Sequence, residues 1–152
     1  MPSGWRIDKP GRDAFSGEGA RLYGGRWNSP GLAVVYLSEH QSLAALEIMV
    51  HQQPLTPRGQ YLAYFVTWDE TQMERVPPKN LPANWRASPP EPANMSLGDD
   101  WVKAQRSLIL AVPSAIVPAE VNFLLNPAHP DFRHLRTPKP VEFNFDPRLL
   151  GR

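Results

Sequence analysis

One carboxylate in the sequence lies where a helix would otherwise be apolar. Leu43, Leu46, Glu47 and Val50 are spaced so that they would share one face of a helix, and three of the four are apolar. A glutamate on the inward face of a helix costs free energy unless it is paired or faces a cleft. Glu47 is therefore a candidate for site chemistry. The alternative is that it lies at the edge of the apolar face and reaches solvent.

A glycine-rich stretch, residues 16–31, carries a second set of candidates. Its five glycines let the backbone approach another backbone or a ligand closely. Arg26 could form a bidentate contact with a pyrophosphate, and Trp27 could either stack on a ligand or anchor the core. The stretch has neither a Gly-x-Gly-x-x-Gly motif nor a Walker A lysine, so a doubly wound nucleotide fold is not supported. An ordinary turn is the alternative.

Other reactive side chains give weaker signals. His51 and His129 have no partner at metal-ligand spacing, so no metal is expected. Neither Ser107 nor Ser114 lies in the Gly-x-Ser-x-Gly elbow of a serine hydrolase. Cysteine is absent, which removes thiol nucleophiles, disulfides and cysteine-ligated zinc.

Length and composition predict one folded, soluble domain. The chain has 152 residues, of which 41 % are hydrophobic, and no apolar run approaches the ~20 residues of a membrane helix. The first residues lack the apolar segment of a secretory signal, so a cytoplasmic location is expected. The net charge is +1, and the basic residues are scattered among the acidic ones. Neither a membrane nor direct binding of nucleic acid is therefore predicted.

Several short strands and few helices predict an α+β fold. Apolar and alternating patterns indicate strands over residues 32–37, 60–68, 107–112, 121–125 and 141–145. A helix is expected over residues 39–52, with Ser38 and Gln41 as its capping box and Pro54 ending it. A second, short helix is expected over residues 101–106, with Asp99 or Asp100 as its cap.

Proline is unusually frequent, with eighteen copies. The stretch from Val76 to Pro92 excludes a regular helix or a central strand. It predicts an ordered loop or flap, over about residues 76–97, within a single domain. A linker is the alternative, but the flanking segments are short for separate domains.

Taken in order, these segments resemble the RES domain, a family named for an arginine, a glutamate and a serine. The resemblance covers roughly residues 5 to 150. Its matching segments are Trp5-Arg6-Ile7, Phe15 to Ala20, Gly24-Gly25-Arg26-Trp27-Asn28, Gly31, Val35 to Ser38, Ala44 to Glu47, Val112 to Pro118, Glu120, Asn122, Asn126-Pro127, His129-Pro130 and Phe143 to Arg148.

The resemblance implies a fold and an activity. The fold would be a compact α+β domain, residues 1–152, like that of ADP-ribosyltransferases and diphtheria-type toxins. NAD⁺ would be a substrate rather than a cofactor, and its nicotinamide–ribose bond would be broken with water or inorganic phosphate as the acceptor. The alternatives are transfer of ADP-ribose onto a protein and a non-catalytic domain that binds an antitoxin or a nucleotide.

The resemblance also implies a partner. Family members are toxins whose gene partner is usually an Xre-type helix-turn-helix antitoxin that blocks the active site. The oligomeric state stays open between a homo-oligomer and a toxin–antitoxin hetero-oligomer.

The site residues follow from the same resemblance. The catalytic set would be Arg26, Tyr36, Glu47 and Ser114, with Ser107 as the competing serine. Glu47 would stabilise the cationic ribose, Tyr36 would stack on nicotinamide, and Ser114 would hydrogen-bond the ribose or the amide. The substrate-binding set would be Arg6, Gly25, Trp27, Asn28 and Asn126, with Arg6 and Arg26 at the pyrophosphate. Structural alternatives are a core role for Tyr36, a salt bridge for Arg26 and a turn for Ser114.

Overall fold

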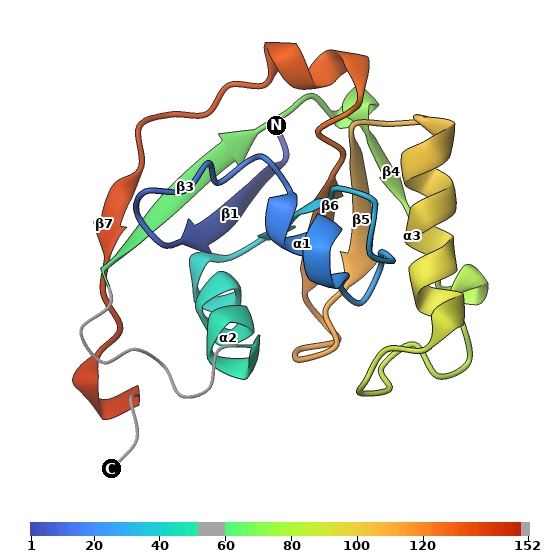
Figure 1. The fold of residues 1–152 in the computed structure, drawn as a ribbon, viewed down its shortest axis with the longest axis horizontal. Helices are drawn as coiled ribbons and strands as arrows, with labels where there is room; N and C mark the ends of the chain where they lie inside the picture. Colours follow the sequence, from blue (N-terminus) through green and yellow to red (C-terminus); the bar gives the residue numbers. More distant parts are fainter. Residues whose placement is uncertain (52–59, 150–152) are drawn as a thin grey trace.

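A mixed seven-stranded sheet forms the centre of the fold. The computed structural model describes residues 1–51 and 60–149. The strand order is β4-β5-β6-β2-β1-β3-β7, so that the sheet extends from β7 at the left of Figure 1 to β4 at the right. The strands are β1 Ser3–Asp8, β2 Val35–Ser38, β3 Tyr61–Thr67, β4 Met73–Arg75, β5 Ile109–Pro113, β6 Val121–Leu125 and β7 Val141–Phe143. Only the β4–β5 pair is parallel among these neighbours.

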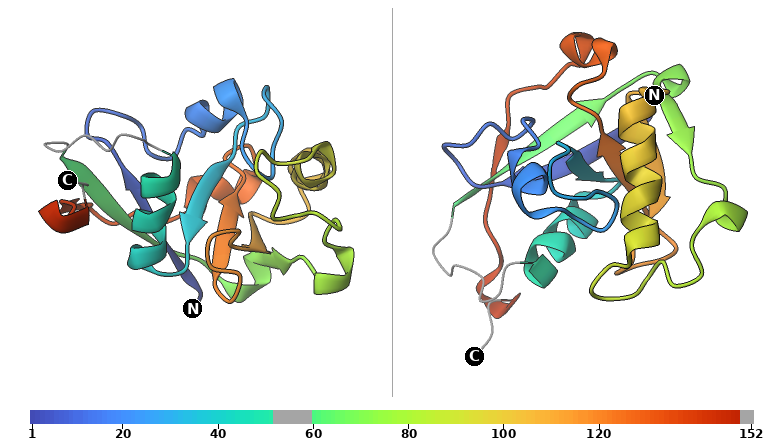
Figure 2. Two further views of the ribbon diagram at one scale, coloured as in Figure 1. Left: turned by 90° about the horizontal axis from the view of Figure 1, so that it is seen from below. Right: turned by 45° about the vertical axis from the view of Figure 1, so that its right-hand side comes forward.

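Three α-helices accompany the sheet. They are α1 Glu18–Tyr23, α2 Gln41–His51 and α3 Pro92–Ala104, and short 3₁₀ turns cover Glu70–Gln72, Pro78–Asn80, Pro130–His134 and Pro147–Leu149. Helix α2 packs across β1 and β2, and α3 lies toward the β4 end of the sheet (Figures 1 and 2). Helix α2 therefore lies over the middle of the sheet, where β2 and β1 are neighbours.

The two faces of the sheet pack into separate clusters because successive side chains of a strand point to opposite sides. Val35 and Leu37 of β2 pack with Phe123 of β6 on one side. On the other side, Trp101 and Val102 of α3 pack in a cluster with Trp27, Val34, Leu110, Val112 and Leu124. A third cluster, under α2, holds Ile7, Ala44, Tyr61, Ala63 and Phe145.

Most predicted strands are confirmed, with shifted ends. The segment 121–125 coincides with β6, and 60–68 contains β3. The strand expected over 32–37 is β2 at 35–38, and the one expected over 107–112 is β5 at 109–113. Pairing with β3 ends β7 at Phe143, while Phe145 packs edge-on against Tyr61 in the core.

The capping box predicted for α2 is wrong. Ser38 is the last residue of β2 and pairs with β6, and its hydroxyl donates to Asn122 Oδ1 at 2.8 Å. Its side chain is therefore engaged by the sheet, and the helix begins at Gln41. The last residue of the predicted helix, Gln52, lies outside the described residues, as does Pro54.

The second predicted helix is longer than expected and begins earlier. Helix α3 starts at Pro92, which suits the first turn of a helix because that turn needs no amide donor there. Asp99 is not its cap but lies within it, and its carboxylate accepts the amide of Ser29 at 2.8 Å. The predicted flap is thus a loop only as far as Glu91. Burial of residues such as Gly98 and Trp101 compensates for a sequence with few strong helix formers.

Three elements had no sequence signal that we recognised. They are β1, α1 and β4. Helix α1 lies in the glycine-rich stretch and has no buried residue, so it carries no apolar periodicity. Strand β4 has only three residues, too few to show alternation. Within residues 1–51 and 60–149, no helix is both long and apolar enough to cross a membrane.

Gly98 supplies a test of how α3 is seated. A Cβ at this position would overlap the carbonyl group of Trp27, which is backbone and cannot swing away. We expect Gly98→Ala to lower the free energy of unfolding by more than ~2 kcal/mol, measured by urea denaturation. The control is Gly19→Ala in α1, where the added Cβ meets no atom within 4 Å. It should be neutral or stabilise the protein by up to ~1 kcal/mol. Equal stability of the two variants would contradict this packing.

Candidate active site

Polar side chains from strands β2 and β6, from the residue after β5 and from one helix meet on the face of the sheet beneath α2. Tyr36 and Ser38 alternate along β2 and so share a face, and Asn122 of β6 is the direct cross-strand partner of Ser38. Ser114 follows the last residue of β5, and its amide continues the ladder by donating to the carbonyl of Glu120 at 2.9 Å. Glu47 reaches this group from α2.

Glu47 is the centre of the group. Its Oε1 accepts a hydrogen bond from Asn122 Nδ2 at 2.8 Å and a longer one from Ser114 Oγ at 3.4 Å. Its Oε2 lies 3.5 Å from His51 Nε2, one helical turn further on. The Glu47 side chain is 25 % exposed, so a ligand can still reach the carboxylate.

The prediction that Leu43, Leu46 and Val50 lie on a buried face of α2 is wrong in part. Leu43 is buried, but Leu46 and Val50 are 39 % and 54 % exposed. The face that packs holds Ala44 and Ile48, because the third core cluster lies on that side of α2. Glu47 is therefore at the border between the packed and exposed faces. It is paired with the sheet rather than released into solvent.

The surroundings of Glu47 favour its ionised form. Burial opposes ionisation, but hydrogen bonds from His51, Asn122 and Ser114 outweigh it and hold the pKa of the carboxyl below its ordinary value. The Glu47 carboxylate also interacts electrostatically with Arg26. The site thus presents a fixed negative charge at neutral pH.

The two candidate serines have different surroundings. Ser114 is buried, touches Glu47, and accepts the amides of Ile116 and Val117 at 3.1 Å each. Ser107 instead accepts the Trp101 indole N–H at 2.8 Å and donates to the carbonyl of Ile109. Only Ser114 is in contact with Glu47. Ser114 therefore has the turn-forming role that was considered for it and also contacts Glu47.

Tyr36 is held by the glycine-rich turn. Its hydroxyl donates to Asn28 Oδ1 at 2.6 Å and accepts the amide of Trp27 at 3.1 Å. A Cβ on Gly25 would lie 2.7 Å from this hydroxyl, so glycine is needed for the approach. Burial raises the pKa of Tyr36 well above its ordinary value. The phenol therefore stays neutral, and its position is fixed.

Arg26 binds the proline-rich loop. Its Nη1 donates to the carbonyls of Trp85 and Ala87 at 2.9 and 2.7 Å. Burial lowers the pKa of Arg26, while the nearby Glu47 and Tyr36 act in the opposite direction, and an arginine stays charged throughout. Within residues 1–51 and 60–149, Arg26 does not form the salt bridge that was considered for it. The two backbone carbonyls take the place of a carboxylate.

The proline-rich loop is a wall of the site rather than a linker. Trp85 stacks on Trp27 with ring centroids 6.4 Å apart. Arg86 donates through Nε and Nη2 to the carbonyl of Ala115, at 3.1 and 3.0 Å. The loop is therefore tied both to the glycine-rich turn and to the turn that follows Ser114.

Arg6 lies one strand away from Tyr36. Its Nη1 donates to the Tyr36 carbonyl at 3.2 Å, and its Nη2 contacts Asp8 Oδ2 at 3.3 Å. Burial lowers the pKa of Arg6, and the Asp8 carboxylate counteracts it. Its Nε is buried without a hydrogen-bond partner in the described part of the chain. Arg6 is thus adjacent to the site through the backbone of β2.

Three of the residues expected to bind substrate are structural. The Trp27 side chain is 2 % exposed and belongs to the core. Asn28 is fully buried, and its Nδ2 donates to the carbonyls of Ala20, Ser29 and Leu32. Asn126 is also fully buried, bonded to the Val102 carbonyl and the Ala128 amide. Their burial and satisfied hydrogen bonds leave these side chains unavailable to a ligand.

Two residues of the site, Asn122 and Ser38, were missed as functional candidates. The signal for Asn122 was available, since it is the one polar residue within the apolar strand 121–125. Its meaning depended on register, because only the pairing of β2 with β6 brings it to Ser38 and Glu47.

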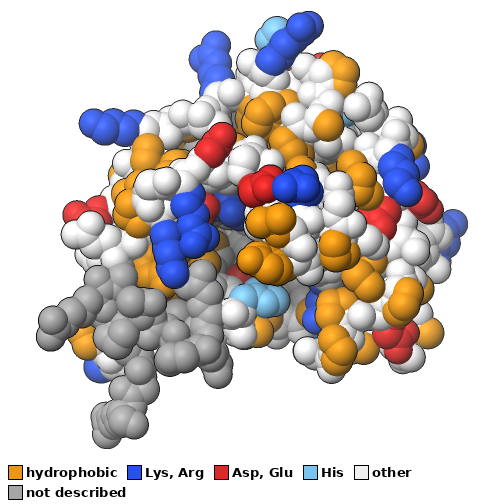
Figure 3. Space-filling model, in the orientation of Figure 1, with side chains coloured by type: hydrophobic (Ala, Val, Ile, Leu, Met, Phe, Trp, Pro, Cys, Tyr) orange, Lys and Arg blue, Asp and Glu red, His pale blue; other side chains and the backbone are white. Residues whose placement is uncertain are grey.

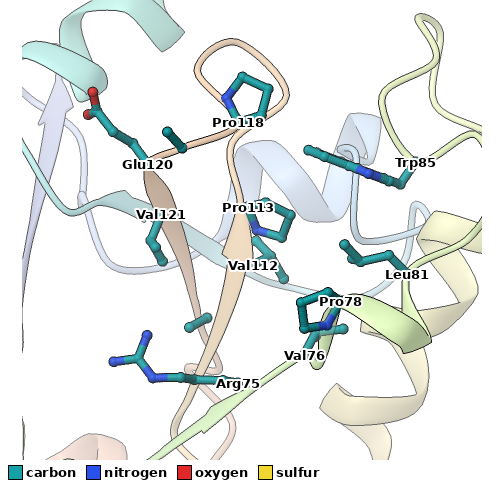
Figure 4. Close-up of a pocket in the computed structure, with 12 residues that line it drawn as sticks. Arg75, Val76, Pro78, Leu81, Trp85, Val112, Pro113, Pro118, Glu120 and Val121 are labelled. Atoms are coloured by element: carbon teal, nitrogen blue, oxygen red, sulfur yellow. The ribbon is translucent and has the colours of Figure 1, made fainter.

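Two hollows lie near this group. The face that carries α1 and α2 is hollowed near its centre, and acidic, basic and histidine side chains border the hollow (Figure 3). A separate pocket of about 330 Å³ lies between the proline-rich loop and the β5–β6 hairpin (Figure 4). It is largely apolar, with Leu81, Trp85 and Pro113 among its lining residues, and it contains none of Arg26, Tyr36, Glu47 or Ser114. The polar group around Glu47 is therefore separate from this pocket.

A separate group of carboxylate and histidine side chains could ligate a metal ion, but a structural role accounts for it. Ligand atoms of Glu39, His40 and Glu120 lie within 4.8 Å of one another. Glu39 Oε1 already accepts the amide of Val121 at 2.7 Å, which ties the start of α2 to β6. We assign no ion to this cluster.

Comparison with known proteins gives consistent matches. A family model described as the RES domain matches residues 3–146. A protein named Prs ADP-ribosylating toxin, from Sphingobium sp. strain YBL2, is 41 % identical over 97 % of this chain and 96 % of its own. A protein named Toxin Res, from Yersinia enterocolitica, is 40 % identical over 89 % of this chain and 90 % of its own.

A solved structure supports the fold. It is described as the M. tuberculosis MbcT–MbcA toxin–antitoxin complex, and one of its chains matches with a TM-score of 0.77 at 20 % identity, over 97 % of this chain and 86 % of that one. The likeness confirms the predicted compact α+β fold.

The structural role of Asn28 can be tested by stability. Asn28→Ala would remove the acceptor of the Tyr36 hydroxyl and the side-chain donor that the carbonyls of Ala20, Ser29 and Leu32 share. We expect a loss of about 2–4 kcal/mol in the free energy of unfolding, measured by urea denaturation. Asn144→Ala is the control, because Asn144 is exposed, and it should change stability by less than ~0.5 kcal/mol. An unaltered stability of Asn28→Ala would restore Asn28 as a candidate ligand-binding residue.

The ionised state of Glu47 predicts a pH dependence of stability. Its pKa is lower in the folded protein than the value of about 4.3 in an unfolded chain. Its contribution to stability is therefore fully present above pH ~4.3 and is lost as the pH falls through the lower folded-state pKa. We expect the stability difference between wild type and Glu47→Gln to shrink from about pH 6 to about pH 3, measured by urea unfolding. A constant difference would mean that Glu47 is not held as an anion.

Proposed function

Because the chain belongs to the RES domain family, we propose that it is an enzyme that breaks the nicotinamide–ribose bond of NAD⁺ and serves as the toxin of a toxin–antitoxin pair. One observation carries the activity: the partly exposed Glu47 carboxylate is held ionised beside Ser114 and within electrostatic reach of Arg26 and Tyr36. The toxin role is supported by the names of the relatives.

The reaction needs an anion near the ribose. When the C1′–N bond breaks, its electron pair moves to the nicotinamide ring nitrogen, and positive charge develops on C1′ and the ring oxygen of the ribose. Nicotinamide leaves as a neutral molecule, so no strong general acid is required. Glu47 is the group we assign to stabilising the cationic sugar.

The acceptor then forms a new bond to C1′. With water, an oxygen–carbon bond forms, and a proton is released that Glu47 can take up as a general base. With inorganic phosphate, the phosphate oxygen forms the bond and the product is ADP-ribose 1″-phosphate. Ser114 Oγ, next to Glu47, is placed to hydrogen-bond either acceptor or the ribose.

Arg26 and Tyr36 are assigned to binding the substrate. Both bonds from Arg26 to the proline-rich loop use Nη1. We assign its Nε and Nη2 donors to the phosphate oxygens of NAD⁺, with Arg6 as a second cation. The Tyr36 hydroxyl is anchored at both its donor and its acceptor side, which fixes the ring that we assign to stacking on nicotinamide.

An antitoxin partner is supported by features of the surface. Leu46 and Val50 are exposed on the same helix as Glu47, and Leu22 and Tyr23 are exposed at the end of α1. Exposed apolar residues that flank a charged cleft are typical of a protein-binding surface. We propose an Xre-type antitoxin that covers this face.

Transfer of ADP-ribose onto a protein is the second candidate. It is favoured by the name of the Sphingobium relative, an ADP-ribosylating toxin. The same Glu47 and Arg26 would serve it, with a protein side chain in place of water or phosphate as the acceptor. The products distinguish the two reactions.

The activity is tested with purified protein and NAD⁺, with and without phosphate, by following nicotinamide release. We expect Glu47→Gln to reduce the rate by ~100-fold or more, because it removes the charge that stabilises the cation. Glu142→Gln is the matched control, since Glu142 is exposed on β7, and it should retain the wild-type rate. Release that depends on phosphate identifies a phosphorylase, and release without phosphate a glycohydrolase.

Two results would count against the proposal. If Glu47→Gln cleaves NAD⁺ as fast as wild type, Glu47 is not in the mechanism. If adenine-labelled NAD⁺ instead labels protein, the enzyme is a transferase.

A further inference from the structure

A two-step hydrogen-bond relay connects the centre of the sheet to Glu47. Ser38 Oγ donates to Asn122 Oδ1 at 2.8 Å, and Asn122 Nδ2 donates to Glu47 Oε1 at 2.8 Å. Ser38 and Asn122 face each other in the β2–β6 register, and Ser38 is only 3 % exposed. The relay is therefore built on paired backbone in the middle of the sheet.

The chemistry of the three groups fixes the direction of the relay. An ionised carboxylate accepts hydrogen bonds but cannot donate them, so the amide must turn its NH₂ toward Glu47. The amide oxygen then faces Ser38, whose hydroxyl can donate to it. If the amide turned over, its oxygen would face the Glu47 carboxylate and no bond would form. The ionised Glu47 thus selects this orientation of the amide, and the Ser38 hydroxyl anchors it by donating to the amide oxygen.

We propose that Asn122 is the positioning residue of the site: it fixes the Glu47 carboxylate against the sheet, and Ser38 fixes Asn122. The kinetic part of this inference rests on the proposed NAD⁺-cleaving function, whereas its structural part does not.

The other contacts of Glu47 cannot replace this one. The Ser114 contact is longer, at 3.4 Å, and the Ser114 hydroxyl oxygen already accepts two backbone amides. His51 lies 3.5 Å away with its side chain 73 % exposed, on the last turn of α2. Asn122 makes the shortest bond and is the only one of the three that sits within a strand of the sheet. A displaced carboxylate about 1 Å from its productive position can cost ~100-fold in rate.

The proposal predicts a change in the titration of Glu47. The charged or titratable groups that act on it are His51 on its own helix, Arg26 in the glycine-rich turn and Tyr36 on β2. Asn122 is neutral, so it affects the pH profile only through the bond that it donates. Its replacement should therefore move the acid limb of the profile, which a loss of fold stability alone would not do.

The test compares Asn122→Asp and Asn122→Ala with wild type. Asn122→Asp keeps the shape but places a second carboxylate against Glu47, so the acid limb of kcat should move to higher pH. Asn122→Ala removes the donor, and kcat should fall about 10- to 100-fold with KM changed less than about 2-fold. If Asn122→Ala does not fold, the isosteric Asp variant carries the test alone.

A double-mutant cycle tests the part played by Ser38. Ser38→Ala should lower kcat by about 3- to 10-fold, because the amide oxygen loses the donor that anchors it. In the Asn122→Ala background, the same change should have no further effect on kcat. Full additivity of the two substitutions would mean that Ser38 does not act through Asn122.

Leu125→Ala is the matched control. Leu125 is a fully buried core residue of β6 that packs with Val35 and Leu37, on the opposite face of the strand from Asn122. It should lose stability but keep the wild-type pH profile and kcat. An equal shift of the profile in Leu125→Ala and in the Asn122 variants would overturn the proposal.

Carboxyl ¹³C NMR titration separates this proposal from the proposed function. The Glu47 resonance is assigned by its absence in Glu47→Gln, and its pKa should rise in both Asn122 variants. If wild type releases no nicotinamide but this pKa rises, the function is wrong and the positioning role stands. If the pKa stays unchanged in both variants, the positioning role is wrong whatever the enzyme does.

Discussion

The hydrogen bond between Asn122 Nδ2 and Glu47 Oε1 joins α2, which lies across β1 and β2, to the central strand β6 of the sheet. A carboxylate in this partly buried position must be paired with donors if it is to stay charged. Three conditions have to hold together for that pairing. Helix α2 must present Glu47 at the border of its packed face, β2 must pair with β6 in the observed register, and Ser38 must anchor the amide oxygen of Asn122. The chemistry proposed for the site depends on all three.

A second set of contacts holds the cationic side of the site, and it is built from close backbone approaches. Gly25 lets the Tyr36 hydroxyl enter the glycine-rich turn, and Gly98 lets α3 touch the same turn from the other side. Arg26 then spans the gap to the proline-rich loop through the carbonyls of Trp85 and Ala87. Aromatic stacking of Trp85 on Trp27 supports this contact from the core. The loop and the turn therefore act as one unit, although about sixty residues separate them in sequence.

The sequence was most informative where a local pattern decides the structure. The apolar run at 121–125 and the mixed run at 60–68 are strands because their side chains suit a pleated, buried surface. It was least informative where tertiary contacts decide. Helix α3 begins nine residues before the predicted start at Trp101, because packing of Gly98 and Trp101 outweighs weak propensity. The ends of β2 and the use of Ser38 were likewise set by pairing with β6.

The candidate site also divides into residues that a sequence motif predicts and residues whose role depends on tertiary contacts. The resemblance identified Arg26, Tyr36, Glu47 and Ser114, and the fold brings Ser114 against Glu47 with Arg26 and Tyr36 within electrostatic reach. It could not separate ligand-binding asparagines from structural ones, because burial is not visible in a motif. Asn28 and Asn126 are buried and fully bonded, whereas Asn122 faces Glu47.

The strand order has a consequence for synthesis of the chain on the ribosome. Glu47 is translated early, but Ser114 and Asn122 come from strands made some seventy residues later, so the nascent chain can assemble the complete site only after β6 has left the ribosome.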